Sequence, residues 1–244
     1  SGDILVSGGG GAIAMAGALT TTSDTATATT VRDATTVALP AITTGTSGTT
    51  VIGVGGDISG AVTQSGSTTL STETLTGDTT GSVDLGNANT VPTLGAFTSN
   101  GFILNDGDPL SVAGALADGA GNVTLTSSGT ITETGGGLIG TTGTLKTTSA
   151  GGTALGGANV VSTFDATNTG SGAVSLANGA ATTLTVTGLS QTGGGLVSLT
   201  NTGAVAFANT NSADGGLSVT SSNGGVTLGS ACADSLTVSG GPLS

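Results

Sequence analysis

Apolar residues two positions apart recur along residues 174–238, and this pattern limits the fold more than any other feature of the chain. Residues i and i+2 lie on the same face of a strand, so each pair predicts a short strand with one buried face. The residues between and around the pairs are mostly Thr, Ser, Ala and Asn. The pairs are Val174/Leu176, Leu184/Val186, Val197/Leu199, Val205/Phe207, Leu217/Val219, Val226/Leu228 and Leu236/Val238.

The spacing of these pairs predicts how the strands are arranged. Every second pair recurs after 19 to 23 residues. A unit of about twenty residues with at least two short strands is typical of one coil of a parallel β-helix. Glycines in breaks such as 193–195 and 223–225 are expected to supply the positive φ angles of the corners. We predict an all-β fold, a right-handed parallel β-helix (β-solenoid) with coils of about 20 residues, the right hand being general for parallel crossovers.

A longer repeat is also present. Residues 74–96 match residues 144–166 at an offset of 70, as in Leu75/Leu145, and a further series of matches beginning at Leu110/Leu184 has an offset of 74. We interpret residues 74–143 and 144–217 as two approximate copies of a unit of three to four coils. Residues 1–73 are more degenerate, and we expect the same solenoid there, with or without a protruding loop. Residues 1–244 are thus predicted to form a single elongated solenoid.

Composition separates this prediction from other classes of protein. Only 7% of the residues are charged, but no apolar run approaches the roughly 18 residues of a transmembrane helix. Disorder is disfavoured because the mean hydropathy is +0.35 and the apolar residues are regularly placed. Two basic residues, Arg32 and Lys146, face 14 acidic ones, giving a net charge of -12. Such a polyanion is repelled by phosphates and anionic lipids, so neither nucleic acid nor membrane insertion is expected.

The low charge itself agrees with stacked coils. Like residues lie about 4.8 Å apart in such a stack, where like charges repel. Apolar columns are therefore expected inside and Thr and Ser outside. The charges are expected at corners, where five acidic residues lie close to glycine: Asp57, Asp78, Asp106, Asp118 and Asp214.

The chain resembles the repeat regions of filamentous-haemagglutinin-like adhesins, large bacterial surface proteins exported by two-partner secretion. The resemblance covers roughly residues 74–240 and is strongest in VTLTSSGTITETGGG (123–137), LGNANTVPTLGAFT (85–98), LGGANVVSTFDAT (155–167) and LSQTGGGLVSLTNTGAV (189–205). It implies a right-handed parallel β-helix on the outside of a bacterium. We expect a structural or adhesive segment of an extracellular or cell-surface fibre, for which a host or cell-surface glycan or protein is a possible partner.

The sequence offers little for catalysis. The chain has no His or Tyr and only two basic residues, which removes most general bases and oxyanion partners. We predict no enzyme and no cofactor. The single cysteine, Cys232, is interpreted as a small buried hydrophobe, with an intermolecular bridge or a reactive thiol as the alternative.

One acidic cluster has an alternative interpretation as a metal site. Asn105, Asp106 and Asp108 could offer oxygen ligands to a calcium ion. The same residues, with Gly107 between them and Pro109 behind them, are also typical of a turn. The turn is the favoured interpretation, and a calcium-binding corner is kept as the alternative.

Ice binding is a further alternative function. It would need a flat face on which Thr-x-Thr pairs recur once per coil, and Thr124/Thr126 and Thr185/Thr187 fit that pattern. An irregular face is instead indicated by the corresponding residues of other strands, and strand propensity alone accounts for the threonines. Those residues are Ser198/Thr200, Ser218/Thr220 and Ser175/Ala177.

The remaining predictions concern the core and the ends. Asn89 and Asn159 are expected to form inward or corner amide ladders. The four phenylalanines are expected to fill the core: Phe97, Phe102, Phe164 and Phe207. The first residues show neither an initiator Met nor a basic segment, so we interpret the chain as processed or as a piece of a longer protein. No charged cap is visible at Leu243, and head-to-tail self-association through the coil ends is expected.

Overall fold

The computed structural model describes residues 2–229 and 234–244, which form 26 strands and no helix. Every strand pairing among these residues is parallel, and the described part has no helix long and apolar enough to cross a membrane. The strands are β1 Ile4–Ala14, β2 Leu19–Thr20, β3 Thr29–Leu39, β4 Ile42–Thr43, β5 Thr49–Ile52, β6 Val62–Gln64, β7 Leu70–Ser71, β8 Thr74–Asp78, β9 Val83–Asn89, β10 Thr93–Thr98, β11 Phe102–Asp106, β12 Leu110–Val112, β13 Ala115–Ala117, β14 Val123–Ser127, β15 Thr130–Glu133, β16 Leu138–Ser149, β17 Gly152–Asn168, β18 Val174–Asn178, β19 Leu184–Val186, β20 Ser190–Gln191, β21 Val197–Asn201, β22 Val205–Phe207, β23 Thr210–Ala213, β24 Leu217–Ser221, β25 Val226–Leu228 and β26 Ser235–Val238.

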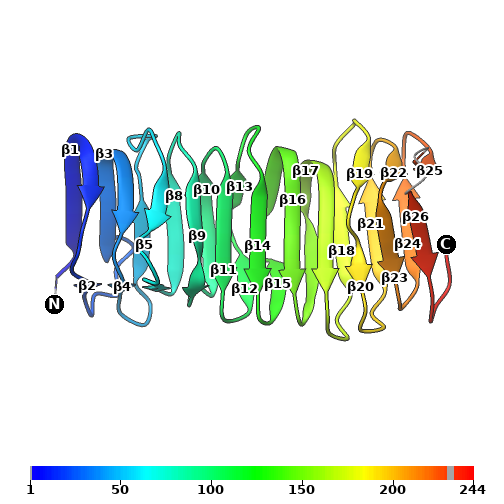
Figure 1. Cartoon of the computed structure of the whole chain (residues 1–244), viewed down its shortest axis with the longest axis horizontal. Helices are drawn as coiled ribbons and strands as arrows, with labels where there is room; N and C mark the ends of the chain where they lie inside the picture. Colours follow the sequence, from blue (N-terminus) through cyan, green and yellow to red (C-terminus); the bar gives the residue numbers. More distant parts are fainter. Residues whose placement is uncertain (1, 230–233) are drawn as a thin grey trace.

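The chain winds into a stack of coils, with its two ends at opposite ends of a rod (Figure 1). One column of apolar residues, here called the core column, follows the whole stack and shows the coil length directly. Successive members are 19 to 25 residues apart, and ten intervals of about 4.8 Å give a stack about 48 Å long. The predicted β-solenoid is confirmed, with coils of about 21 residues. The core column is Ile13, Val37, Val62, Val83, Phe102, Val123, Leu145, Phe164, Val186, Phe207 and Leu228.

Each coil has two long sides, joined by corners and by shorter strands. Side A carries the core column. Side B is the other wall that continues through most of the stack. It is formed, in order, by β5, β8, β10, β12, β15, the start of β17, β18, β21 and β24.

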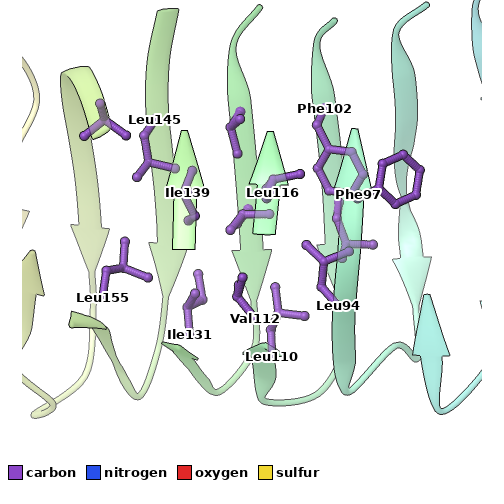
Figure 2. Close-up of a cluster of buried hydrophobic side chains, with 14 of the residues drawn as sticks. Leu94, Phe97, Phe102, Leu110, Val112, Leu116, Ile131, Ile139, Leu145 and Leu155 are labelled. Carbon is purple, nitrogen blue, oxygen red and sulfur yellow. The ribbon is translucent and has the colours of Figure 1, made fainter. Parts of the chain in front are cut away.

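Aliphatic and aromatic side chains from both sides fill the interior of the coils. Figure 2 shows Leu94 of β10, Phe102 of β11, Leu116 of β13 and Leu145 of β16 pointing into this space. The rings of Phe97 and Phe102 lie 4.9 Å apart in a tilted arrangement. The prediction that the four phenylalanines fill the core is confirmed, because each is at most 1% exposed.

The residues before β8 also form stacked coils, although their sequence is more degenerate. β1 pairs with β3 through seven matched residues, and β3 pairs with both β5 and β6. The short strands β2, β4 and β7 form a small sheet of their own in these first coils. Weak alternation in the sequence therefore does not interrupt the winding.

The two copies of the long repeat occupy different sides of the coil. Leu75 stacks on Leu94 in side B, whereas its counterpart Leu145 belongs to the core column in side A. Leu85 lies in side A, whereas Leu155 stacks on Leu176 in side B. An offset of 70 residues is therefore not a whole number of coils. The same segment suits either side because both sides need apolar residues inside and small polar residues outside.

The corner glycines serve two different purposes. Gly194 has a φ of 77°, as predicted for a corner. The breaks 193–195 and 223–225 were expected to supply positive φ angles, but Gly193, Gly195, Gly224 and Gly225 do not have them. A Cβ at Gly193, Gly195 or Gly224 would overlap with the backbone of the neighbouring coil instead. Glycine is required there because the coils approach closely.

Candidate functional site

The predicted calcium ligands do not come together in this structure. Asp106 points inward at the end of β11, where its Oδ1 accepts a hydrogen bond from the Val91 amide at 2.9 Å. Asn105, its neighbour in the strand, points outward and donates to the Gly86 carbonyl at 3.3 Å. Asp108 is exposed in the corner that follows. The described residues contain no group of three or more acidic, His or Cys side chains placed to hold a metal.

Three carboxyl groups lie buried or half-buried at three different corners: Asp106, Asp118 and Glu133. Asp118 Oδ1 accepts hydrogen bonds from Ser99 Oγ and the Gly101 amide, both at 2.7 Å. Glu133 Oε2 accepts from the Gly157 amide at 2.6 Å. The second oxygen of each carboxyl is buried without a hydrogen-bond partner.

Burial therefore raises the pKa of all three carboxyl groups, and that of Asp106 reaches about 6. The nearby charge of Asp108 raises the Asp106 pKa further, while the Val91 amide lowers it. Asp106 and Asp118 were predicted as corner charges. They do lie at corners, but they face the interior rather than solvent.

Buried amides also line the corners. Asn159, Asn178 and Asn201 stack in register, and Asn178 Nδ2 donates to Asn201 Oδ1 at 3.0 Å. The predicted amide ladder at Asn159 is thus confirmed. Asn89 pairs with an amide of the preceding coil, since its Oδ1 accepts a hydrogen bond from Gln64 Nε2 at 2.7 Å, but in the next coil it stacks on Asp106. Its Oδ1 also accepts the Leu70 amide at 2.8 Å. These side chains satisfy backbone groups where the chain turns, so their role is structural.

The outer surface of side B is the most regular polar surface of the molecule, and we call it the hydroxyl face. Over the eight coils from β8 to β24 it consists of one outward residue per coil, together with the residue two positions later in the same strand. β5, the first strand of side B, is not included because it carries Val51 in the second column. The sixteen residues are all Thr, Ser, Ala or Gly. The first of each pair are Thr74, Thr93, Ser111, Thr132, Ala154, Ser175, Ser198 and Ser218, and the second are Thr76, Gly95, Ala113, Thr134, Gly156, Ala177, Thr200 and Thr220.

The Thr-x-Thr pairs singled out in the sequence do not belong to this face. Thr124 lies in side A, between Ile103 and Lys146 of the adjacent coils. Thr185 stacks between Thr163 and Ala206, in a different column. Both pairs lie on the outer surface of side A, because Thr124 follows Val123 and Thr185 precedes Val186 in the core column, but they are displaced by two residues along the strand and do not recur once per coil. Three other pairs, which in the sequence indicated an irregular face, do lie together on the hydroxyl face. They are Ser175/Ala177, Ser198/Thr200 and Ser218/Thr220.

Both basic residues lie away from the hydroxyl face and pair with aspartates of adjacent coils. Arg32 Nε lies 2.9 Å from Asp57 Oδ2, and Lys146 Nζ lies 3.6 Å from Asp165 Oδ2. The surplus of negative charge therefore belongs to corners, side A and the ends of the rod.

The two ends of the rod expose apolar groups. Six hydrophobic residues pack only partly against the core, and they fall in the first and last coils: Val6, Met15, Leu19, Val219, Leu236 and Val238. At the C-terminal end, Val226, Leu228 and Leu243 are at least half exposed. A hollow of about 290 Å³ lies there, floored by Phe207 and Leu217. Cys232, predicted to be buried, lies outside the described residues.

Comparison of the chain with protein-family models, with curated proteins and with solved structures finds no match.

Proposed function

We propose that the protein is a structural and adhesive segment of a bacterial extracellular or cell-surface fibre, and that copies of this chain assemble head to tail. The observation that carries the proposal is the apolar character of both ends of the stack. The core column ends in Leu228, which is 54% exposed, and begins at Ile13, which is buried but lies beside the partly buried Met15.

Docking of a second copy would continue both the hydrogen bonding and the core. Among the described residues, β25 and β26 have no later strand to pair with and β1 has no earlier one. A parallel strand added at either edge satisfies these backbone groups, while apolar residues close the column. Leu228 of one copy would then meet Ile13 of the next, at the interval found within the chain.

Charge favours growth along the axis over growth from the sides. The net charge of -12 makes two side walls repel each other wherever acidic groups meet. Burial of apolar groups at the ends is not opposed in this way. The resemblance to filamentous-haemagglutinin-like repeats supports placing such a fibre on a bacterial surface.

The test compares the chain with two single variants, Leu228→Asp and Val160→Asp. Leu228 and Val160 are both 54% exposed, but Val160 lies on the wall in the middle of the rod. We expect the unmodified chain and Val160→Asp to form filaments in electron microscopy at high concentration. Leu228→Asp should remain monomeric in gel filtration.

Head-to-tail assembly is refuted by an unmodified chain that stays monomeric in light scattering at high concentration. It is equally refuted if Leu228→Asp forms filaments as readily as Val160→Asp. Circular dichroism should show the same β signal in all three proteins, so that a loss of assembly is not a loss of folding.

A further inference from the structure

The peptide bond between Asp108 and Pro109 lies in the corner between β11 and β12, where both residues are exposed. It is the one bond in the chain that joins an aspartate to a following proline. An aspartate carboxyl can attack the carbonyl carbon of its own residue, because the product is a five-membered cyclic anhydride. The bond that breaks in this reaction is the one to the nitrogen of the next residue, here Pro109.

The proline favours this reaction for two reasons. Its nitrogen carries no hydrogen, so it cannot instead attack the aspartate side chain to form a succinimide. It also leaves as a basic secondary amine, which takes up a proton readily. Every other aspartate of the chain is followed by a residue whose amide nitrogen carries a hydrogen. Asp108 therefore differs chemically from all of them.

The next coil places a hydrogen-bond donor on the carbonyl that would be attacked. Ser127 Oγ donates to the Asp108 carbonyl oxygen at 2.7 Å, and the Ser127 side chain is buried. The Thr130 carbonyl is a second acceptor for the same hydroxyl, but it lies farther away, at 3.1 Å. The Gly129 amide donates to Ser127 Oγ at 3.1 Å, which makes the hydroxyl a stronger donor. A donor in this position stabilises the negative charge that the oxygen gains during the attack.

The stack also holds the chain on both sides of the bond. Before it, the Gly107 amide donates to the Asn89 carbonyl at 2.7 Å, and Ser128 Oγ donates to the Gly107 carbonyl. After it, the Ser111 amide donates to the Pro92 carbonyl at 2.8 Å. The attacked carbonyl and its donor are therefore kept together in the folded state, and this fixed placement is lost when the chain unfolds.

Asp106 is the titratable group that faces Asp108 at this corner. The corners of the two adjacent coils, residues 89–92 and 127–130, contain no titratable side chain. Asp106 loses its charge as the pH falls through about 6, the value to which burial and the charge of Asp108 raise its pKa. That loss removes a negative charge from the corner where the attacked oxygen becomes negative. Acid also supplies the protons that the leaving nitrogen needs.

We propose that the folded corner promotes self-cleavage of the Asp108–Pro109 bond at acidic pH, which divides the chain into residues 1–108 and 109–244. An Asp108 Oδ atom forms a bond to the Asp108 carbonyl carbon, and the bond from that carbon to the Pro109 nitrogen breaks. The electron pair of the broken bond leaves with the nitrogen, which takes the carboxyl proton. Water then opens the anhydride to two carboxyl groups, so that one water is consumed for each bond broken.

This activity goes beyond the fibre role and does not depend on head-to-tail assembly. The cut leaves β1–β11 and β12–β26 as two stacks of coils. These stacks remain joined, because β11 pairs with β14 and β10 pairs with both β12 and β13. The rod therefore stays whole until those ladders separate, and their separation would expose the core between the two stacks.

The experiment incubates the purified chain at pH 4 and at pH 7 with protease inhibitors and follows the intact mass over days. Sequencing of the products identifies a new N-terminus at Pro109. The variants are Asp108→Glu, which keeps the carboxyl but would need a six-membered anhydride, and Ser127→Ala, which removes the donor. Each protein is measured folded and in guanidinium chloride, where the Ser127 donor is no longer held on the carbonyl. Circular dichroism verifies the fold of the first set of samples.

We expect the folded chain at pH 4 to be cleaved at least tenfold faster than at pH 7, and at least tenfold faster than the unfolded chain at pH 4. Asp108→Glu should stay intact. Ser127→Ala should lose the advantage of the folded state, but should equal the unmodified chain when both are unfolded.

A folded chain that stays intact at pH 4 overturns the proposal, as does Asp108→Glu cleaved as fast as the unmodified chain. Equal rates for folded Ser127→Ala and the folded unmodified chain also overturn it, because cleavage would then be the ordinary lability of the bond and not an activity of the folded corner.

Discussion

Several strands place a polar side chain at their third inward position, after two apolar ones. Phe102, Leu104 and Asp106 follow this order in β11, and Val174, Leu176 and Asn178 follow it in β18. The third inward residue faces a corner, where backbone amides have no partner in the sheet. Asn178 Oδ1 accepts the Val161 amide at 2.8 Å, as Asp106 accepts that of Val91. The sequence alternation indicates that Asp106 is buried, because Asp106 lies two positions after Leu104 and therefore on the same inward face as Phe102 and Leu104.

Asp106 makes stability depend on pH. Burial raises its pKa from 3.8 to about 6, so the folded state binds the proton more tightly than the unfolded chain. The stabilisation is complete below pH 3.8 and is lost as pH rises through 6, a loss of about 3 kcal/mol at most. Asp118 and Glu133 act in the same direction because burial raises their pKa values too.

We predict that Asp106→Asn raises the free energy of unfolding at pH 7 by about 1 to 3 kcal/mol, because the amide removes a buried charge. Its Oδ1 can still accept the Val91 amide, as asparagines do at four equivalent corners. Urea unfolding at pH 4 and pH 7 measures the effect. The variant should show a smaller decrease between the two values than the unmodified chain. An equal decrease in both proteins contradicts this account of Asp106.

Some corners between the strands can hold only glycine, because the adjacent coil leaves no room for a Cβ. Gly172 has an ordinary φ, yet a Cβ there would overlap with the Gly151 carbonyl oxygen of the preceding coil. Gly140 lies within β16, where a Cβ would meet nothing within 4 Å. Two glycines that both lack a positive φ therefore differ in what their neighbours in the stack allow.

We predict that Gly172→Ala lowers the free energy of unfolding by about 1 to 3 kcal/mol, because neighbouring coils would have to separate. Gly140→Ala should be neutral or stabilising by less than about 1 kcal/mol, since it only restricts the unfolded chain. Thermal and urea unfolding of both variants measure the difference. Equal effects would mean that the corner relaxes freely and that close approach of the coils is not what requires glycine.

For the whole molecule, a solenoid has contacts only between adjacent coils, so its interior and its ends differ in stability. An interior coil is held on two sides, whereas the first and last coils are each held on one. We predict that hydrogen exchange in the monomeric Leu228→Asp variant is slowest in residues 83–213 and fastest in the two end coils. Exchange measured by mass spectrometry tests this. Uniform protection along the chain would contradict it, and filaments of the unmodified chain should protect the ends as well.

The fold class could be predicted because its signals are local. Alternation at i and i+2 marks Val197 and Leu199 as one buried face without knowledge of any partner strand, and the recurrence near twenty residues gives the coil length. The phenylalanines and the Asn159 ladder followed from the same reasoning. The burial of Asp106 does not follow from the residue types alone, because an aspartate next to glycine is typical of an exposed turn.

The sequence by itself determined that the backbone winds into parallel coils around an aliphatic interior, since that outcome depends on periodicity within and between short segments. Only the tertiary structure decided which outward residues share a surface. Coils vary from 19 to 25 residues, and the sides are chemically alike, so register cannot be read from the local pattern. That is why Ser198 and Thr132 belong to one face, while Thr124, which looks similar in the sequence, lies beside Lys146 on another.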